Sequence, residues 1–401
     1  MLRRAPIVAL LVAEVVSMTG SLMSALALPW FVLVTTGSAS RAAYVVGAEV
    51  LAYALLGIPS GSVAARLGAR RTMLACDLCR APVVALIPAL YMEGLLSFPT
   101  LLVLSFATGA LSTPYASAQQ VVLPEILGED QTLIAQANAV FQSASRLTYL
   151  LGPALSGLLV GFLGAKNVLL IDAATFVVSF VLVAAFIPRI ARSPAEPDLG
   201  GVWAGLRFLW RDPLLRTLTV AQMGSQIAFQ ALALALPVLA FQRYEHNAKL
   251  AGLFLATWGG GALAGSVIAY RVVRRFDPLV LGSVAWFGYA LPLWLLAPEL
   301  PAAAVFAPLL LAGIGNGVRN PPLASIRILR VPASLRPQTL TASGTLAWLG
   351  GAVALAGIGT ALRALGLVAV FAIIAAISTT SAIAFGASVS RARRAPAAEA
   401  V

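Results

Sequence analysis

The feature that most constrains the fold of this chain is a series of long apolar runs. An apolar helix of about twenty residues spans a hydrocarbon core roughly 30 Å thick. The 401 residues are 60% hydrophobic and only 10% charged, too few polar residues to cover a soluble globule. We therefore expect an all-α membrane protein with twelve transmembrane helices. The runs lie near residues 7–34, 42–64, 72–92, 98–120, 134–161, 166–187, 217–241, 250–270, 278–297, 302–322, 338–361 and 365–388.

The formal charge of +12 is explained by the membrane and not by nucleic acid. With the N-terminus inside, 19 of the 27 Lys and Arg residues lie on cytoplasmic segments. This is the bias that orients helical membrane proteins, so we expect both termini to be cytoplasmic. The first apolar run follows Met-Leu-Arg-Arg as a secretory signal would, but it is too long and eleven further runs follow. We interpret it as a membrane helix.

A fifteen-residue stretch occurs twice, 204 residues apart. Residues 57–71 read GIPSGSVAARLGARR, residues 261–275 read GALAGSVIAYRVVRR, and the two agree at seven positions. In each copy, small residues four apart on one helix face precede a short basic turn, and such a face lets another helix approach closely. We expect two pseudo-symmetric six-helix bundles. Their bounds are predicted as 1–187 for the first bundle, 188–216 for a cytoplasmic linker, 217–390 for the second bundle and 391–401 for a tail.

Residues typical of catalysis, metal binding or nucleotide binding are lacking. The only lysines, Lys166 and Lys249, both follow alanine, so the chain has no Gly-Lys-Ser/Thr phosphate loop and no ATPase of its own. It also has no Cys/His cluster that could hold a metal. We expect no enzyme and no cofactor. If the protein moves something uphill, an ion gradient or the substrate's own gradient must drive it.

The first basic turn resembles the major facilitator superfamily. Residues 61–71 are similar to the family's loop signature G-x-L-A-D-R-x-G-R-R/K, but Ala65 stands where the family has Asp, and Ala69 replaces the first paired basic residue. The run Gly-Pro-Ala-Leu-Ser-Gly at 152–157 resembles the helix-5 signature of the family's antiporters. The stretches 123–159 and 171–180 are similar to the drug-efflux branch that includes macrolide and siderophore exporters.

This resemblance implies a monomeric secondary transporter of the bacterial inner membrane. It would export a small amphipathic or lipophilic compound in exchange for protons, by alternating access of a site between the two halves. Membrane lipid and the small-molecule substrate would be its partners, with no nucleic acid. Three alternatives remain open: an importer of the same fold, a lipid flippase, and a membrane scaffold that transports nothing.

The predicted gating residues lie in the two basic turns, next to them, and in the fifth run. The turns could latch to Asp77 and Asp277 in one state of the transporter, or they could only set the topology. Asp77 could instead pair with Arg80, one helical turn away. The predicted gating set is Gly61, Arg66, Gly68, Arg70, Arg71, Asp77, Arg80, Gly152, Pro153, Gly157, Arg274 and Arg275.

Ionisable residues inside the apolar runs are candidates for proton coupling. Glu14, about seven residues into the first run, is the preferred carboxylate and Glu49 the second choice. Arg146 would neutralise one of them. Each carboxylate could instead be a hydrated charge near a membrane interface. Asp172, at the start of the sixth run, is interpreted as structural.

A stripe of amides marks the predicted substrate cavity. Gln222, Gln226 and Gln230 follow one another at intervals of four, which places them along one side of a helix. Amides facing lipid would lack partners, so the stripe must face protein or a wet cavity. With Asn316 they are predicted to contact substrate, although they could equally hold helices together.

Overall fold

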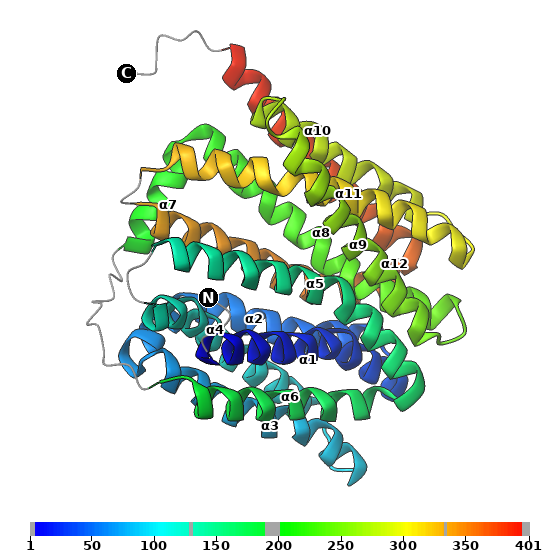
Figure 1. The fold of residues 1–401 in the computed structure, drawn as a ribbon. Coiled ribbons are helices and arrows are strands. Elements are labelled where there is room, and N and C mark those ends of the chain that lie inside the picture. Colours follow the sequence, from blue (N-terminus) through cyan, green and yellow to red (C-terminus); the bar gives the residue numbers. More distant parts are fainter. Residues whose placement is uncertain (1–4, 128–130, 189–200, 333–334, 395–401) are drawn as a thin grey trace. The chain divides into compact units, whose positions relative to one another are not determined.

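The computed structural model describes residues 5–127, 131–188, 201–332 and 335–394. Over these ranges the secondary structure is helical (Figure 1). The helices are α1 (Ala5–Thr36), α2 (Ala39–Leu67), α3 (Ala69–Met92), α4 (Phe98–Leu127), α5 (Gln131–Leu163), α6 (Ala165–Phe186), α7 (Gly201–Arg211), α8 (Pro213–Arg243), α9 (Ala248–Val272), α10 (Pro278–Ala290), the 3₁₀ helix η1 (Leu291–Leu296), α11 (Ala302–Arg330) and α12 (Arg336–Arg394).

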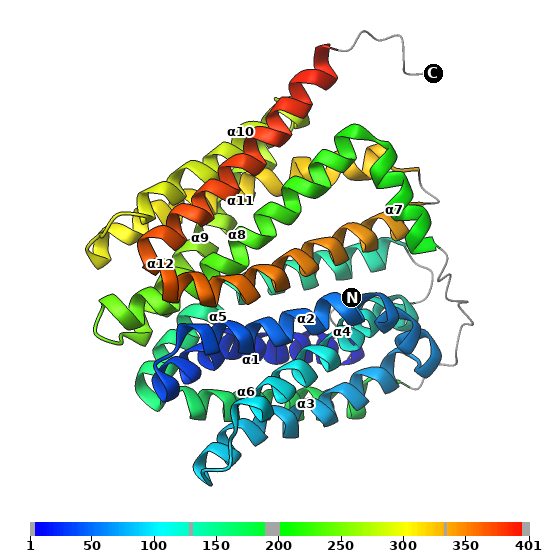
Figure 2. The same cartoon turned by 180° about the vertical axis from the view of Figure 1, so that it is seen from behind.

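Eleven helical segments of the described chain are long and apolar enough to cross a membrane. The last of them runs for 54 residues, Gln338–Arg391. At 1.5 Å per residue that is about 80 Å, more than twice the hydrocarbon thickness. Gly366 divides it, because its backbone is non-helical with a φ of 78°, and Figure 2 shows the orange and red parts of α12 running in different directions. The last segment therefore supplies two spans, and the expectation of twelve transmembrane helices is confirmed.

The helices form two compact units. Unit 1 comprises Met1–Pro197 together with Ala240–Ala256, and unit 2 comprises Asp198–Leu239 together with Thr257–Val401. Helices α1 to α6 lie in unit 1, and α9 is divided between the units after Ala256. The bounds expected for the two bundles, 1–187 and 217–390, stay a prediction.

Unit 1 is built from helix pairs that approach closely. Helix α1 packs on α5 and α6, α2 packs on α4, and α3 packs on α4 and α6. Gly109 on α4 lies against the backbone carbonyl of Glu49 on α2. Small residues allow this approach. Inside a membrane no hydrophobic driving force brings helices together, so the van der Waals packing that close approach permits contributes instead. Apolar side chains of five helices fill a common core, whose members include Leu10, Met73, Tyr115, Phe141 and Val183.

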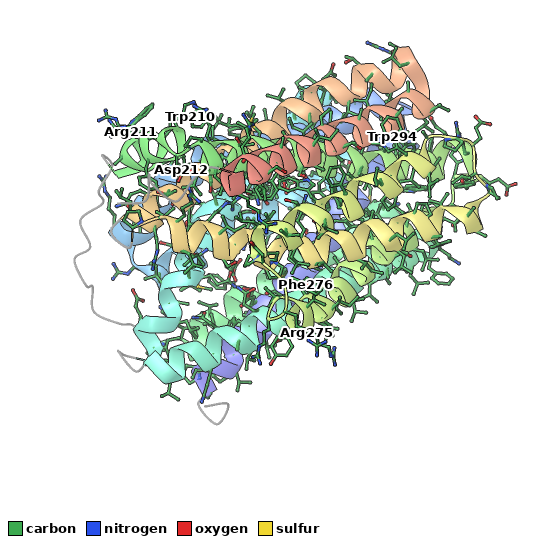
Figure 3. All side chains as sticks on the ribbon, turned by 90° about the horizontal axis from the view of Figure 1, so that it is seen from above. Trp210, Arg211, Asp212, Arg275, Phe276 and Trp294 are labelled. Carbon is green, nitrogen blue, oxygen red and sulfur yellow. The ribbon has the colours of Figure 1, made fainter. Side chains whose placement is uncertain are left out.

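Unit 2 contains α10 packed on α11 and α12, and also α7 packed on α12. Helix α7 lies within the predicted cytoplasmic linker, 188–216, for which the sequence interpretation gave no secondary structure. Its Leu209 is buried with Leu215, Val331 and Ala342 in a small apolar core. Figures 1 and 2 both show α7 beside the first part of α12. At the end of α7, Figure 3 shows Trp210, whose side chain is exposed.

Candidate functional site

A half-polar cavity of about 260 Å³ lies within unit 2. Three of the four residues predicted to contact substrate line it: Gln222 and Gln226 from α8 and Asn316 from α11. The fourth, Gln230, is not among the lining residues. Eight residues rotate an α-helix by about 80° beyond two full turns, so the end of the amide stripe has turned away from the cavity.

Aromatic rings form the apolar part of the cavity. Phe229 of α8, Trp258 of α9 and Tyr289 of α10 line it, together with Ala347 of α12. The rings of Phe229 and Trp258 pack with their centroids 4.9 Å apart. Amides beside aromatic rings suit a compound that is flat and apolar in one part and polar in another.

The most unusual residue of the cavity is Arg319, which was not among the residues predicted to contact substrate. Its side chain is 7% exposed, it lies inside the apolar span Ala302–Arg330, and it lines the cavity. Nη1 donates to Ser225 Oγ and Nη2 to Asn316 Oδ1, both at 2.8 Å. An arginine inside an apolar run is itself a signal of function, and that signal was present in the sequence.

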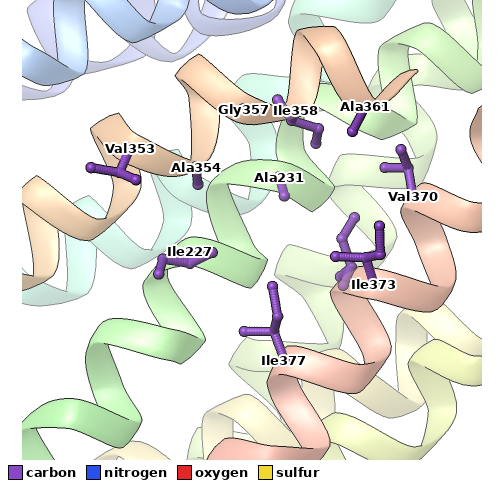
Figure 4. A pocket seen from close by; sticks show the side chains of 11 residues that line it. Ile227, Ala231, Val353, Ala354, Gly357, Ile358, Ala361, Val370, Ile373 and Ile377 are labelled. Atoms are coloured by element: carbon purple, nitrogen blue, oxygen red, sulfur yellow. The ribbon is translucent and has the colours of Figure 1, made fainter. Parts of the chain in front are cut away.

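A second hollow in unit 2 is apolar throughout (Figure 4). It has a volume of about 160 Å³ and is lined by side chains such as Ile227 from α8, Val353 from the first part of α12 and Ile373 from the second part. No polar side chain lines it, so nothing there could orient a ligand. The cavity around Arg319 is therefore the stronger candidate site in unit 2.

The two candidate coupling carboxylates lie in unit 1, and both are half-buried. Glu14 Oε1 accepts a hydrogen bond from Ser145 Oγ at 3.3 Å, and Glu14 Oε2 is buried without a partner in the described structure. Glu49 Oε1 accepts from the Tyr53 hydroxyl at 3.3 Å. Among the described residues, neither carboxylate forms a salt bridge. The side chain of Arg146 lies outside the described part of the chain, so its predicted pairing stays a prediction.

Asp77 and Arg80, both predicted gating residues, form a buried salt bridge within α3. Asp77 also accepts from Ser179 Oγ of α6 at 2.7 Å. The Arg80 guanidinium lies between the rings of Tyr115 and Phe176, 4.2 and 4.3 Å from their centroids. Of the alternatives for Asp77, the structure thus shows the local pair. With its charge balanced by Arg80, Asp77 does not hold the basic turn in this structure.

The carboxylate of Asp172 is more deeply placed than expected. It is 1% exposed, and it lies seven residues after the first residue of α6, Ala165. Its Oδ2 accepts from Ser24 Oγ of α1 at 2.5 Å. This contact joins α1 to α6, which agrees with the structural role predicted for Asp172.

Arg70 of the first basic turn holds the end of α6. Its Nε donates to the carbonyl of Ile187 at 2.7 Å, and its Nη2 donates to the carbonyl of Ala184 at 2.8 Å. The last carbonyls of a helix lack partners within the helix, and a cation there also favours the helix dipole. Gly68 begins the turn with a φ of 84°, a conformation that suits glycine.

The other basic residues of the turns are exposed. Arg66 lies in the last turn of α2 and Arg71 in the first turn of α3, whereas Arg274 and Arg275 follow α9; Figure 3 shows Arg275 beside Phe276 in the second turn. Asp277 is also exposed, and its carboxylate caps α10 by accepting from the Leu279 backbone N–H at 2.7 Å. Both acids proposed as latches are thus engaged locally.

The two copies of the repeat pack differently around their glycines. In the second copy, Gly261 and Gly265 lie against the backbone of α11, near Leu310 and Ile314. In the first copy, a Cβ at Gly57 would meet nothing within 4 Å. Gly61 lies in α2, and its surroundings are outside the described structure. The similarity in sequence therefore does not extend to identical helix contacts.

Helix α5 carries the predicted gating residues Gly152, Pro153 and Gly157, all on buried or half-buried positions. A Cβ at Gly157 would lie 2.6 Å from the Gly252 Cα of α9, so the two backbones are in contact. A Cβ at Gly152 would lie 2.8 Å from the Leu22 Cβ of α1. Pro153 lies inside α5, and its carbonyl approaches Gly252. The two glycines of this run therefore allow close packing of α5 on α1 and α9.

Comparison with known proteins identifies the family. The Major Facilitator Superfamily profile matches residues 10–355. The Multidrug efflux pump Tap of Mycolicibacterium fortuitum is 27% identical over 380 residues, with 92% of each chain covered. Its namesake in Mycobacterium tuberculosis is 26% identical over 379 residues, with 92% of this chain and 90% of the other covered.

A solved structure shows the same fold. The crystal structure of a bacterial homologue of the iron transporter ferroportin has a TM-score of 0.76 at 14% identity, and the match covers 98% of this chain and 100% of the other. The apolar spans, the helical fold and the family match agree with one another. This chain belongs to the Major Facilitator Superfamily, whose members are multi-pass membrane transporters of small molecules and not enzymes.

Proposed function

We propose that this protein is a secondary efflux transporter that exports a small amphipathic or lipophilic compound in exchange for protons. The observation that carries the proposal is the cavity of unit 2, in which amides and a guanidinium face three aromatic rings. Such a surface suits a compound with a flat apolar part and a polar part. The multidrug efflux pumps at 26–27% identity support the direction of transport.

Proton exchange is assigned to the carboxylates of unit 1. Glu14 is the principal candidate because its Oε2 is buried without a partner among the described residues, and Ser145 is its one hydrogen-bond donor there. A carboxylate inside a membrane span can gain and lose a proton more easily when it forms no salt bridge, and none is seen for Glu14 among the described residues. Glu49, bonded to Tyr53, is the second candidate. Arg146 is proposed to face one of the two in part of the cycle.

Gating is assigned to the basic turns and to α5. The protein would lie in a bacterial inner membrane with both termini cytoplasmic. One state of the transporter would be stabilised by four exposed arginines: Arg66, Arg71, Arg274 and Arg275. Because Asp77 and Asp277 have local partners, these arginines would donate hydrogen bonds to carbonyls at helix ends. Arg70 already donates such bonds to the carbonyls at the end of α6. Close packing at Gly152 and Gly157 would seal the path of the compound along α5.

The proposal is tested in proteoliposomes with an imposed pH gradient. A panel of amphipathic compounds is loaded, and we expect movement opposite to the proton gradient that stops when an ionophore collapses it. Glu14→Gln should bind compound but move it only down its own gradient. Glu93→Gln, which removes an exposed carboxylate after α3, is the matched control and should behave as wild type. Uptake with the proton gradient, or equal transport without it, would refute proton-coupled export.

A further inference from the structure

Among the described residues of unit 2, no acid forms a salt bridge with Arg319. Both of its hydrogen-bond acceptors, Ser225 Oγ and Asn316 Oδ1, are neutral, and its Nε is buried without a partner in the described structure. A guanidinium has five N–H donors, so three remain. A buried charge is expensive unless it is paired. The described acids of unit 2 do not line the cavity: Asp212 pairs with Arg330, Asp277 caps α10, and Glu299 lies in the loop before α11.

Arg80 of unit 1 shows how this chain otherwise buries an arginine. Each guanidinium lies near two aromatic rings, which for Arg319 are Trp286 and Tyr289, both with centroids 4.7 Å away. Each also bonds to the residue three positions earlier in its helix. For Arg80 that residue is the carboxylate of Asp77, whereas for Arg319 it is the amide of Asn316. The construction is the same, but in the described structure a neutral amide stands where Arg80 has its carboxylate.

The groups around Arg319 complete a binding surface. Gln222, Gln226 and Asn320 contribute amides that can donate or accept. The ring of Trp258 lines the cavity as well, and its Nε1 is buried without a partner in the described structure. The surface is thus rich in donors and positively charged, and it is bordered by aromatic rings.

We infer that this cavity binds an aromatic carboxylate, with the anionic group on the Arg319 guanidinium and the ring between Phe229, Trp258 and Tyr289. The bound carboxylate gives Arg319 the negative counter-charge that Asp77 gives Arg80. A volume of about 260 Å³ suits a compound of one or two rings. The inference rests on the proposed export function. It adds that the exported compound carries a negative charge.

The test compares 2-naphthoate with its uncharged analogue, 2-naphthamide, which has the same rings and nearly the same shape. Binding to the full-length protein in lipid nanodiscs is measured by equilibrium dialysis. Because a hydrogen bond to a charged group contributes more than one to a neutral group, we expect wild type to prefer the acid by about tenfold or more. Equal affinity for the two compounds would overturn the inference.

The decisive variant is Asn316→Asp, which gives Arg319 an internal counter-charge at the position that Asp77 holds relative to Arg80. It should fold well and bind 2-naphthoate no better than 2-naphthamide. Gln230→Glu makes the same chemical change at a position that does not line the cavity, and it should keep the preference. Arg319→Lys should keep part of the preference, and Arg319→Gln should lose it. An undiminished preference in Asn316→Asp would show that another group binds the anion.

Transport separates this inference from the export function. If proteoliposomes export uncharged or cationic compounds against the proton gradient and wild type shows no preference for the acid, export stands and the anion site is overturned. If the acid is bound with the expected preference and no compound is exported under any gradient, the binding site stands and the export function fails.

Discussion

Replacing Gly157 with alanine tests whether the contact between α5 and α9 is functional. The added Cβ would lie 2.6 Å from the Gly252 Cα, and the Gly252 backbone N would be 2.9 Å away. Carbon atoms normally approach to about 3.5 Å, so the helices must separate locally by about 1 Å. Overpacking of this kind costs about 1–3 kcal/mol. A change of that size lowers the population of the packed arrangement by about 5- to 150-fold relative to one in which the helices are apart.

The matched control is Gly57→Ala, since a Cβ there would meet nothing within 4 Å and Gly57 also lies inside a helix. At such an open position, alanine should stabilise the helix by up to about 1 kcal/mol. Thermal unfolding of the purified proteins and export in proteoliposomes are measured for both variants. We expect Gly157→Ala to unfold at lower temperature and to export slowly, and Gly57→Ala to match or exceed wild type in stability. Wild-type stability and export in Gly157→Ala would refute the reasoning from close packing. Lower stability with unchanged export would show that the contact is structural only.

Three further changes test individual side chains. Arg70→Ala should destabilise the protein by about 1.5–3 kcal/mol per hydrogen bond lost to the end of α6, while Arg71→Ala, on an exposed side chain, should leave unfolding unchanged; equal effects would contradict the assignment of Arg70. Asp77→Ala should cost about 3–5 kcal/mol because it leaves Arg80 buried and unpaired, and unfolding at the wild-type temperature would show that the pair is not needed for stability. Glu14→Gln should make the export rate insensitive to the imposed pH gradient, and an export rate that still follows this gradient would assign coupling to another carboxylate.

The residues that line the cavity of unit 2 show which of its members could be predicted from the spacing of polar residues along a helix and which could not. An interval of four identified Gln222 and Gln226 as neighbours on one face, and both line the cavity. The same interval included Gln230, which the cumulative rotation of the helix turns away. Asn316 was selected as a polar residue in an apolar run, but the same argument applied to Arg319, three residues later. The local sequence offered the Asp77–Arg80 pair, which the structure shows, but it did not show that Arg319 meets Ser225, a residue 94 positions earlier in the chain.

The membrane fold of this protein follows from its sequence. Lipid offers no hydrogen bonds, so apolar runs of this length must be helices with every backbone group satisfied internally, and their number and position follow from the order of apolar residues along the chain. Only the tertiary structure decided which polar groups meet, because those contacts join residues far apart in the chain. Arg70 reaches the carbonyls at the end of α6, Ser24 reaches Asp172, and Gly157 meets Gly252. The same is true of the helix inside the predicted linker, where Leu209 is buried against residues from the far end of the chain. Contacts between residues so far apart in the chain depend on how the helices pack, and a pattern within one helix does not predict them.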